Sequence, residues 1–261
     1  MPKQDDDAYY LLSTVVRAVS VLDEFVNSDQ DLGVTEVARR LGLHKSVVHR
    51  LIATLAELRL LAPGMAPGTY RLGVKALELG LSYLRHSPLD RVAQHHLNRL
   101  AGDLPDMAFH VAILDGKQII YQRSVSGPEV DWVSATLGRR TQAYCTALGK
   151  VLLAYQSPST VDAYLTSVDL KPLTHNTITG SEDLRAELNR IRMHGYSHDN
   201  EEMMIGHTCV GAPIRDHTGF VIAAVSIAGL TDHFTKYGFD SLVEKVGETA
   251  KAISYDLGYS G

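Results

Sequence analysis

VTEVARRLGLHKSVVHRLIATLAEL, residues 34–58, is the most informative stretch of this sequence. Its apolar residues recur at steps of three and four, which is the spacing of one buried face of an α-helix. Gly42 interrupts the pattern, and glycine most readily takes the left-handed backbone that follows a helix. The stretch therefore predicts two short helices joined by the turn Gly42-Leu43-His44, with Thr35 as the N-cap of the first.

The second of these helices separates apolar from polar residues. Five residues are expected to face the core: Val47, Val48, Leu51, Leu55 and Leu58. Four polar residues are expected to face outward from its first two turns: Lys45, Ser46, His49 and Arg50. The major groove of DNA admits such a helix, and basic, hydroxyl or imidazole groups on its first turns can bond base edges or phosphates. The pattern predicts a helix-turn-helix whose second helix binds DNA.

The flanking residues complete a small domain. Ser13 can cap a helix that runs to Val26 and supplies the third helix of the core. Residues 58–73, LRLLAPGMAPGTYRLG, place a Pro/Gly-rich tip between two short apolar segments, which is typical of a β-hairpin or wing. We add Arg71 on this hairpin and Thr35 to the candidate DNA contacts.

The charge distribution separates two parts of the chain. The 261 residues carry a formal net charge of −5, yet residues 31–75 hold seven basic and three acidic residues. Residues 76–261 hold 16 basic and 21 acidic residues. A small basic module before a larger acidic one predicts two domains with different partners, the first of them nucleic acid.

The rest of the chain alternates between helix-like and strand-like patterns. An amphipathic helix with Leu77, Leu81 and Leu84 on one side follows the wing, and a second helix begins after Ser87. Further helices are expected at residues 145–156, 159–167, 181–194 and 239–257. Strands are expected at residues 107–114, 118–125, 130–138, 208–216 and 219–229. This order predicts the α+β class, with an antiparallel sheet flanked by helices.

Composition and missing motifs exclude several classes of protein. With 45% hydrophobic and 21% charged residues the chain is not disordered, and no run of eighteen apolar residues could span a membrane. Residues 1–10 lack the apolar region of a secretory signal, and two distant cysteines form no disulfide scaffold, so a cytoplasmic location is expected. No nucleophile elbow, phosphate-binding loop or dinucleotide fingerprint is present, so neither enzymatic activity nor a cofactor is expected.

Four longer stretches carry a family resemblance. Two lie in the amino-terminal part, HKSVVHRLIATLAELRLL at residues 44–61 and YRLGVKALELG at residues 70–80. Two lie in the carboxy-terminal part, GRRTQAYCTALGKVLLAY at residues 138–155 and the segment of residues 194–229. Together they resemble the isocitrate-lyase-regulator (IclR-type) family of bacterial transcription factors, in the family's order and spacing.

The resemblance implies a winged helix-turn-helix domain at residues 1–75, a linker helix at 76–87 and a GAF-like α+β domain at 88–261 that binds an effector and oligomerises. It implies a ligand-responsive repressor or activator of pseudo-palindromic double-stranded operator DNA. Uncovered leucines on the linker helix further predict a homodimer, which pairs again into a tetramer. The resemblance also implies an effector pocket lined by Val130, Val133, Ala147, Leu148, Asp199, Cys209, Ser226 and Ala228.

The sequence departs from the family at positions that bear on function. Arg59 stands where a glycine commonly closes the recognition helix, and Val47 where a threonine is usual. Ala228 replaces a serine that is common in members that bind small organic acids, and Leu148 is bulkier than the usual residue. These changes favour an effector with an apolar portion, from the organic acids or aromatic metabolites, over a two-carbon acid.

Two other functions stay open at this point. A metal-responsive regulator could use His207 and Cys209, which project to one side of a strand, with Asp199 as a further zinc ligand. An enzyme could combine Glu201 and Glu202 with the histidines near Cys209, although nothing orients a particular histidine beside that thiol.

Overall fold

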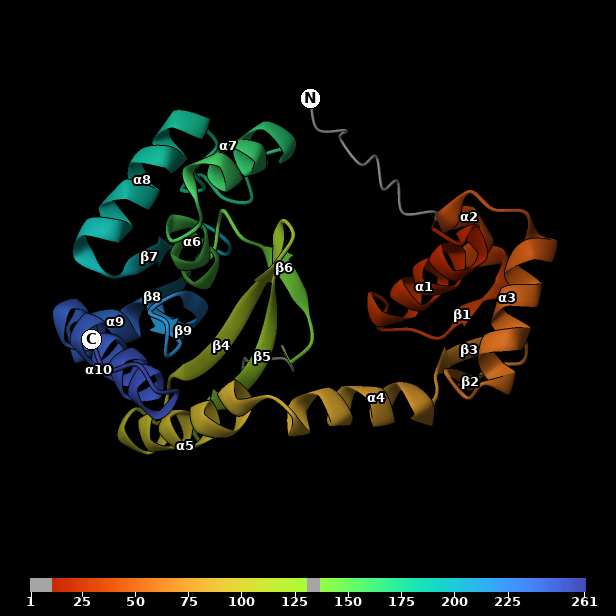
Figure 1. Cartoon of the computed structure of the whole chain (residues 1–261), viewed down its shortest axis with the longest axis horizontal. Helices are drawn as coiled ribbons and strands as arrows, with labels where there is room; N and C mark the ends of the chain where they lie inside the picture. Colours follow the sequence, from red (N-terminus) through yellow and green to blue (C-terminus); the bar gives the residue numbers. More distant parts are fainter. Residues whose placement is uncertain (1–10, 131–136) are drawn as a thin grey trace, which may run out of the picture. The chain divides into compact units, whose positions relative to one another are not determined.

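The computed structural model describes residues 11–130 and 137–261. The chain divides into two compact units, Met1–His86 and Ser87–Gly261 (Figure 1). Each unit has its own buried apolar residues, so each is described by itself. No helix in the described ranges is long and apolar enough to cross a membrane.

Three helices form most of the first unit: α1 (Ser13–Val26), α2 (Val34–Leu41) and α3 (Lys45–Glu57). Gly42 ends α2 in the left-handed conformation, with φ at 63°, as its position predicts. The predicted N-caps are wrong by one or two residues. Gly33 rather than Thr35 precedes α2, and Leu12 rather than Ser13 precedes α1, and neither position makes a side-chain cap.

The core of this unit confirms most of the predicted inward face of α3. Val48 is fully buried, and Leu51 and Leu55 are nearly so. Leu58 is exposed instead of buried, because α3 ends at Glu57 and the chain turns there. Ile52, which was not assigned to the core, has no exposed surface, since it lies one turn after Val48 on the same helix face.

A three-stranded antiparallel sheet completes the unit. The strands β2 (Leu61–Pro63) and β3 (Thr69–Leu72) form the predicted hairpin. A further strand that was not predicted, β1 (Leu32–Gly33), pairs with the other edge of β3. The helix α4 (Val74–Arg85) follows the hairpin and has no buried residue.

The turn between α3 and β2 holds Arg59 in the left-handed conformation, with φ at 60°. The N–H of Leu60 donates to the carbonyl of Leu55, and the N–H of Arg59 donates to the carbonyl of Ala56. These two hydrogen bonds end the helix in a pattern whose left-handed position is normally occupied by glycine. A side chain with Cβ is strained in this conformation by about 1 kcal/mol or more, because Cβ crowds the following carbonyl. The backbone therefore explains why glycine is common at this position in the resembling family.

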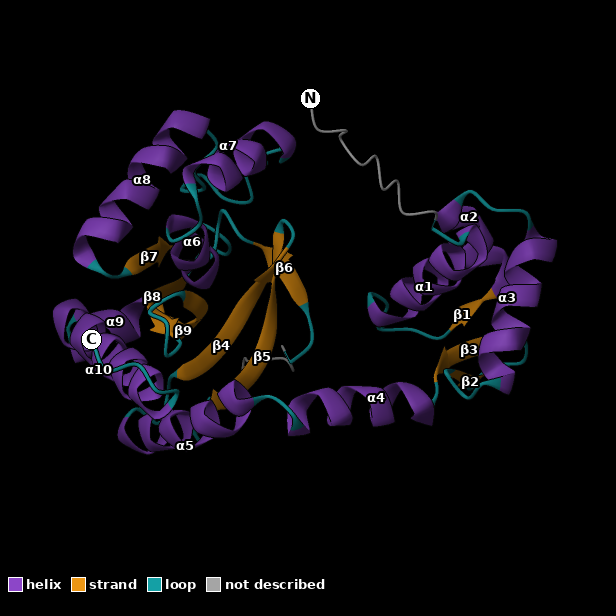
Figure 2. Ribbon diagram, in the orientation of Figure 1, coloured by secondary structure: helices purple, strands orange, loops and turns teal. Residues whose placement is uncertain are grey.

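The second unit is built on a six-stranded antiparallel sheet in the order β6-β5-β4-β9-β8-β7 (Figure 2). Its strands are β4 (Ala108–Asp115), β5 (Gln118–Ser126), β6 (Arg140–Gln142), β7 (Ser197–Asn200), β8 (His207–Arg215) and β9 (Val221–Leu230). Its helices are α5 (Pro88–Asp103), α6 (Ala147–Ala154), α7 (Pro158–Ser167), α8 (Ser181–His194), α9 (Thr231–Tyr237) and α10 (Phe239–Asp256). The predicted α+β class is confirmed.

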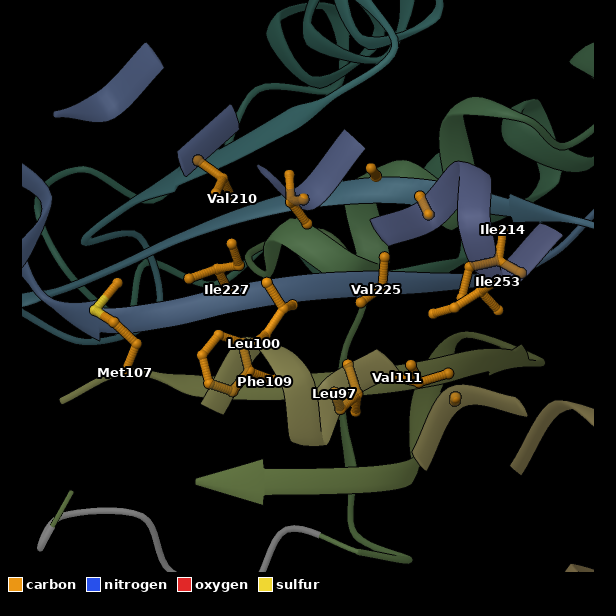
Figure 3. Close-up of a cluster of buried hydrophobic side chains, with 14 of the residues drawn as sticks. Leu97, Leu100, Met107, Phe109, Val111, Val210, Ile214, Val225, Ile227 and Ile253 are labelled. Atoms are coloured by element: carbon orange, nitrogen blue, oxygen red, sulfur yellow. The ribbon is translucent and has the colours of Figure 1, made fainter. Parts of the chain in front are cut away.

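The two faces of this sheet pack against different helices, because successive strand residues point to opposite sides. On one face, Val111 of β4 and Val225 of β9 belong to one buried apolar cluster with residues of α5 and α10, including Ile253 (Figure 3). On the other face, Ala112 and Ala224 pack against α6, α7 and α8. Both faces are buried, and the second one contains the polar side chains described below.

Some elements of this unit differ from those predicted. The strands β6 and β7 and the helix α9 were not predicted, because each is short and none has a repeating apolar pattern. The helix α6 begins at Ala147, two residues after the predicted start. Most of the strand predicted at residues 130–138 lies outside the described residues.

Replacing Arg59 with glycine is expected to stabilise the first unit. Glycine takes φ near 60° without crowding, although its flexibility in the unfolded chain offsets part of the gain. The net increase in the free energy of unfolding should be about 0.5–1 kcal/mol, measured by urea denaturation of the full chain. The matched control is Arg59→Ala, which removes the same charge but keeps Cβ and should give no increase. An equal increase in both variants would assign the effect to the guanidinium instead of the backbone.

Candidate functional site

Four polar residues at the start of α3 form one exposed surface, which we call the α3 surface. Lys45, Ser46, His49 and Arg50 are all exposed, whereas Val48 on the opposite side is fully buried. The ion pairs described in this unit involve other residues. The two positive charges of the α3 surface are therefore available to an external anion.

The other arginines of this unit differ in their pairing. Arg39 and Arg40 of α2 both bind Glu36, each with a nitrogen-to-oxygen distance of 2.7 Å. Hydrogen bonds from Arg39 and then Arg40 lower the pKa of Glu36 to about 2. Arg71 on β3 is exposed and belongs to no ion pair among the described residues, and Thr35 is exposed on the first turn of α2. The basic side chains of this unit without an ion pair among the described residues therefore include Lys45 and Arg50 on the α3 surface and Arg71 on the hairpin.

A cavity of about 210 Å³, the first cavity, lies in the second unit on the sheet face that α6 covers. Its floor comes from three neighbouring strands. His110 of β4 pairs in register with Ser226 of β9, and Cys209 of β8 pairs with Ala228 of β9. The start of α6 and the segment after β7 form its walls. Its lining residues are His110, Tyr121, Thr146, Ala147, Leu148, Asp199, Met203, Met204, His207, Cys209, Ser226, Ala228 and Gly229.

Six of the eight residues assigned to the effector pocket from the sequence lie around this cavity: Ala147, Leu148, Asp199, Cys209, Ser226 and Ala228. Val130 is half-buried and is not a lining residue, and Val133 lies outside the described residues. Six other lining residues were not predicted from the sequence: His110, Tyr121, Thr146, Met203, Met204 and Gly229. His110 could have been found, because it is a polar residue at an inward position of an apolar strand, the signal that singled out Ser226.

Burial shifts the pKa values of His110, Asp199 and Cys209, which line the first cavity, in the direction of their uncharged forms. It lowers the pKa of His110 to about 4, and the Nδ1 of this neutral imidazole lies 2.9 Å from Ser124 Oγ. Burial, together with the nearby Glu202 carboxylate, raises the pKa of Asp199 to about 7. Burial also raises the pKa of the Cys209 thiol well above its usual value, which makes it a poor nucleophile. None of the described lining residues is Lys or Arg.

The start of α6 supplies hydrogen-bond donors to this cavity. Thr146 is the N-cap, and its Oγ1 accepts a hydrogen bond from the N–H of Gly149 at 3.1 Å. The N–H groups of Ala147 and Leu148 have no acceptor within a helix and lie at its positive end, where carboxylates bind well. The cavity can therefore hold a molecule with one anionic end and an apolar body against Leu148 and Met203.

The candidate zinc ligands lie around the same cavity. Asp199 and Cys209 are direct partners between β7 and β8, and His207 is also a lining residue. Across residues 11–130 and 137–261, no group of three or more His, Cys, Asp or Glu side chains is arranged to hold a metal ion. Nothing in this arrangement favours the metal-responsive alternative.

Comparison with protein families gives two matches that together span most of the chain. Residues 14–63 match the IclR helix-turn-helix domain, and residues 81–255 match the C-terminal domain of the bacterial transcriptional regulator IclR. The transcriptional regulator KdgR of Escherichia coli K12 is 32% identical over 99% of this chain and 96% of its own length. The regulator XynR of the same strain is 30% identical over 95% of this chain and 98% of its own length.

Solved structures are similar over both units. The IclR protein of Thermotoga maritima is 34% identical, with a TM-score of 0.71, over 95% of this chain and 99% of its own. The Agrobacterium tumefaciens repressor BlcR is 31% identical, with a TM-score of 0.61, over 96% of this chain and 99% of its own. An IclR homolog from Microbacterium hydrocarbonoxydans, in complex with 4-hydroxybenzoate, is 26% identical, with a TM-score of 0.80, over 94% of this chain and 98% of its own.

The raised pKa of Asp199 predicts a pH dependence of stability. The unfolded carboxyl ionises near pH 4, whereas the folded one stays protonated up to about pH 7. Between these values the unfolded state binds fewer protons, so this group lowers the free energy of unfolding as the pH rises. Asp199→Asn cannot ionise. The free energy of unfolding of the variant minus that of wild type should therefore increase by on the order of 1–3 kcal/mol from pH 5 to pH 8, measured by urea denaturation.

Asp216→Asn is the control for this measurement. Hydrogen bonds from the side chain and backbone of Thr218 and from the backbone of Phe220 lower the pKa of Asp216, so it is ionised across the same pH range. Its stability difference from wild type should stay constant between pH 5 and pH 8. A constant difference for Asp199→Asn as well would contradict a protonated carboxyl at that position.

Proposed function

The chain belongs to the IclR family of bacterial transcriptional regulators, and we propose that it binds a pseudo-palindromic operator as a homodimer and responds to a small organic acid. In this proposal residues 1–75 bind DNA, residues 76–87 form the linker, and residues 88–261 bind the effector and pair further copies. The observation that carries it is the α3 surface, which places unpaired basic groups on the first turns of the second helix of a helix-turn-helix.

Each residue assigned to DNA has a chemical role in this proposal. Arg50 can donate two hydrogen bonds to one guanine in the major groove, and Lys45 can donate to a base edge or a phosphate. Ser46 and His49 lie beside them and can bond phosphates. Arg71 is the basic group of the hairpin, and Thr35 offers a hydroxyl at the first turn of α2, where a phosphate is also favoured by the helix dipole.

Exposed apolar residues support the homodimer. Leu77 and Leu81 of α4 are 60% and 44% exposed, and Val15 and Val19 of α1 are more than half exposed. Apolar surface of this extent commonly marks a protein interface. Two recognition helices that enter successive major grooves also require two copies. Pairing through the effector domains would give a tetramer. Light scattering at micromolar concentration measures the number of chains in the assembly directly. A monomeric protein would rule out the proposed binding of a homodimer to two half-sites.

The first cavity supports an organic acid with an apolar body as the effector. The N–H groups at the start of α6 and the hydroxyl of Ser226 are uncharged donors that suit a carboxylate. Leu148 and Ala228 supply apolar contacts. A cavity of about 150 Å³ can hold benzene, so the first cavity can hold a ring with small substituents. The Microbacterium homolog binds 4-hydroxybenzoate, which has these features and is our first probe.

An enzymatic role has less support than a regulatory one. The raised pKa of the Cys209 thiol leaves it largely unreactive at neutral pH. The named relatives are transcriptional regulators. A role without catalysis and a cytoplasmic location remain predictions of the sequence.

Arg50→Ala is expected to weaken operator binding by about 1–3 kcal/mol, which is roughly five- to 150-fold. Thermal stability should hardly change, because the side chain is exposed. Gel shifts measure this on a DNA site selected by the wild-type protein from random sequences. Arg39→Ala is the control, since this arginine is also exposed but is paired with Glu36, and the variant should lose less than threefold in operator affinity. Wild-type binding by Arg50→Ala would place the DNA contact elsewhere.

Ser226→Ala is expected to weaken effector binding by about 1 kcal/mol, or roughly fivefold, because it removes one hydrogen bond in a buried position. Operator affinity without effector should be unchanged. The measurement is titration of the full chain with 4-hydroxybenzoate by thermal shift and calorimetry, since a ligand that binds the folded state raises its stability. Equal binding by the variant and wild type would remove Ser226 from the site.

A further inference from the structure

A second cavity, of about 290 Å³, lies behind the segment that walls the first cavity. Residues of this segment alternate between the two: His198, Asn200 and Glu202 line the second cavity, whereas Asp199 and Met203 line the first. The alternation begins in β7, which lies next to α6 and α8 in Figure 1, and follows from the strand period of two. One stretch of chain therefore separates two hollow spaces.

A buried ion network forms the inner wall of the second cavity. Lys150 of α6 is only 1% exposed. Its Nζ donates to Glu202 Oε1, to the carbonyl of His198 at 2.5 Å and to Glu187 Oε1 at 3.5 Å. Arg190 of α8 holds Glu187 with two hydrogen bonds of 2.7 and 2.9 Å. Two positive and two negative side chains thus cancel, and all three donors of the ammonium are occupied.

Two buried polar atoms of this cavity have no hydrogen-bond partner: Glu202 Oε2 and His198 Nε2. Glu202 is 5% exposed, so its second carboxylate oxygen has also lost its contact with bulk water. Burial lowers the pKa of His198 to about 4, so its imidazole is neutral. Buried polar atoms without partners are costly and normally bind a protein group, water or a ligand.

We propose that the second cavity is a further small-molecule site, which takes an uncharged compound with two or more hydroxyl groups, such as a sugar or polyol. Hydroxyl groups can donate to Glu202 Oε2 and can bond His198 Nε2 in either tautomer of the ring. An ammonium would add a positive charge beside Lys150, and a carboxylate would face the open oxygen of Glu202. The ring of Phe239, 4.7 Å from that of His198, offers an apolar wall to the carbon skeleton.

This site is independent of the effector proposed for the first cavity, but the two share a wall. The N–H of Glu202, which lines the second cavity, donates to Oδ1 of Asp199, which lines the first, at 2.8 Å. Glu202 therefore helps to hold the Asp199 carboxyl in position. A ligand that holds Glu202 in place would also hold Asp199. Any coupling of this kind acts equally in both directions.

Saturation-transfer NMR on the full-length protein tests the proposal. The probes are xylitol, D-glucose and glycerol as uncharged polyols, with ethanolamine as a cation and acetate as an anion. We expect at least one polyol to give a signal that rises to saturation, and neither charged probe to do so.

Two variants remove the unpartnered atoms separately. Glu202→Gln can keep the bond to Lys150 through its carbonyl oxygen but presents an N–H donor in place of the open acceptor. His198→Phe removes the ring nitrogen and touches no ion pair. Each should lower the affinity for the polyol at least tenfold. Ser226→Ala, which alters the first cavity, should bind the polyol like wild type. Thermal melting verifies that each variant is folded.

His198→Phe decides the result if Glu202→Gln fails to fold because the charge of Lys150 is left uncompensated. Equal polyol binding by wild type and His198→Phe would overturn the proposal. So would stronger binding of ethanolamine or acetate, or no signal from any of the three polyols with the wild-type protein, which would leave water as the occupant. Failure of Ser226→Ala to alter 4-hydroxybenzoate binding would contradict the effector proposal alone.

Discussion

The second unit depends on the burial of both faces of its six-stranded sheet. Every residue of the central strands must therefore pack against something, whichever way it points. Most of the residues that point toward α5 and α10, such as Val111 and Val225, are apolar and form one buried cluster on that side. On the other side, His110 and Ser226 interrupt the apolar series at adjacent positions of β4 and β9. Polar groups pack poorly against an apolar helix, so the interface with α6 opens there into the first cavity.

The helix α6 connects this sheet to both cavities through one unusual residue. All eight residues of α6 are buried, and one of them is Lys150. A buried ammonium is tolerated only with close partners, and here these come from α8 and from the segment after β7. The positions of those two elements are therefore fixed relative to α6, whose first turn contributes to the first cavity. The electrostatic requirement of a single side chain thus sets the shape of the walls around it.

Long periodic patterns allowed much of the fold to be predicted from sequence. The helix-turn-helix, the hairpin and α10 follow from apolar residues at regular steps, and Gly42 marks a helix end through its backbone alone. The misplaced cap at Thr35 and the exposed Leu58 show that an apolar pattern locates a helix end only to within one or two residues. The strand β7, with the sequence SHDN, has no apolar alternation because polar residues face both sides.

The candidate sites were harder to predict than the fold. Six pocket residues were assigned through the family resemblance, but their mutual distances depend on the register of β7, β8 and β9 and on the packing of α6, from a distant part of the sequence, against that sheet. The burial of Lys150 could not be predicted, since nothing local distinguishes it from a lysine on a helix surface. The second cavity combines α6, α8, α10 and β7, and only the folded chain brings these elements together.

The linker helix α4 has a consequence for the control of gene expression. It has twelve residues and buries none of them, and a helix of that length is marginally stable on its own in water. Its order therefore depends on whatever covers its leucines. Where a second copy covers them, folding of the linker and association of the chains become one equilibrium. Below the dissociation constant of that equilibrium, the amount of binding-competent protein rises with the square of the total concentration. Modest changes in synthesis or degradation of the chain would then produce larger changes in promoter occupancy.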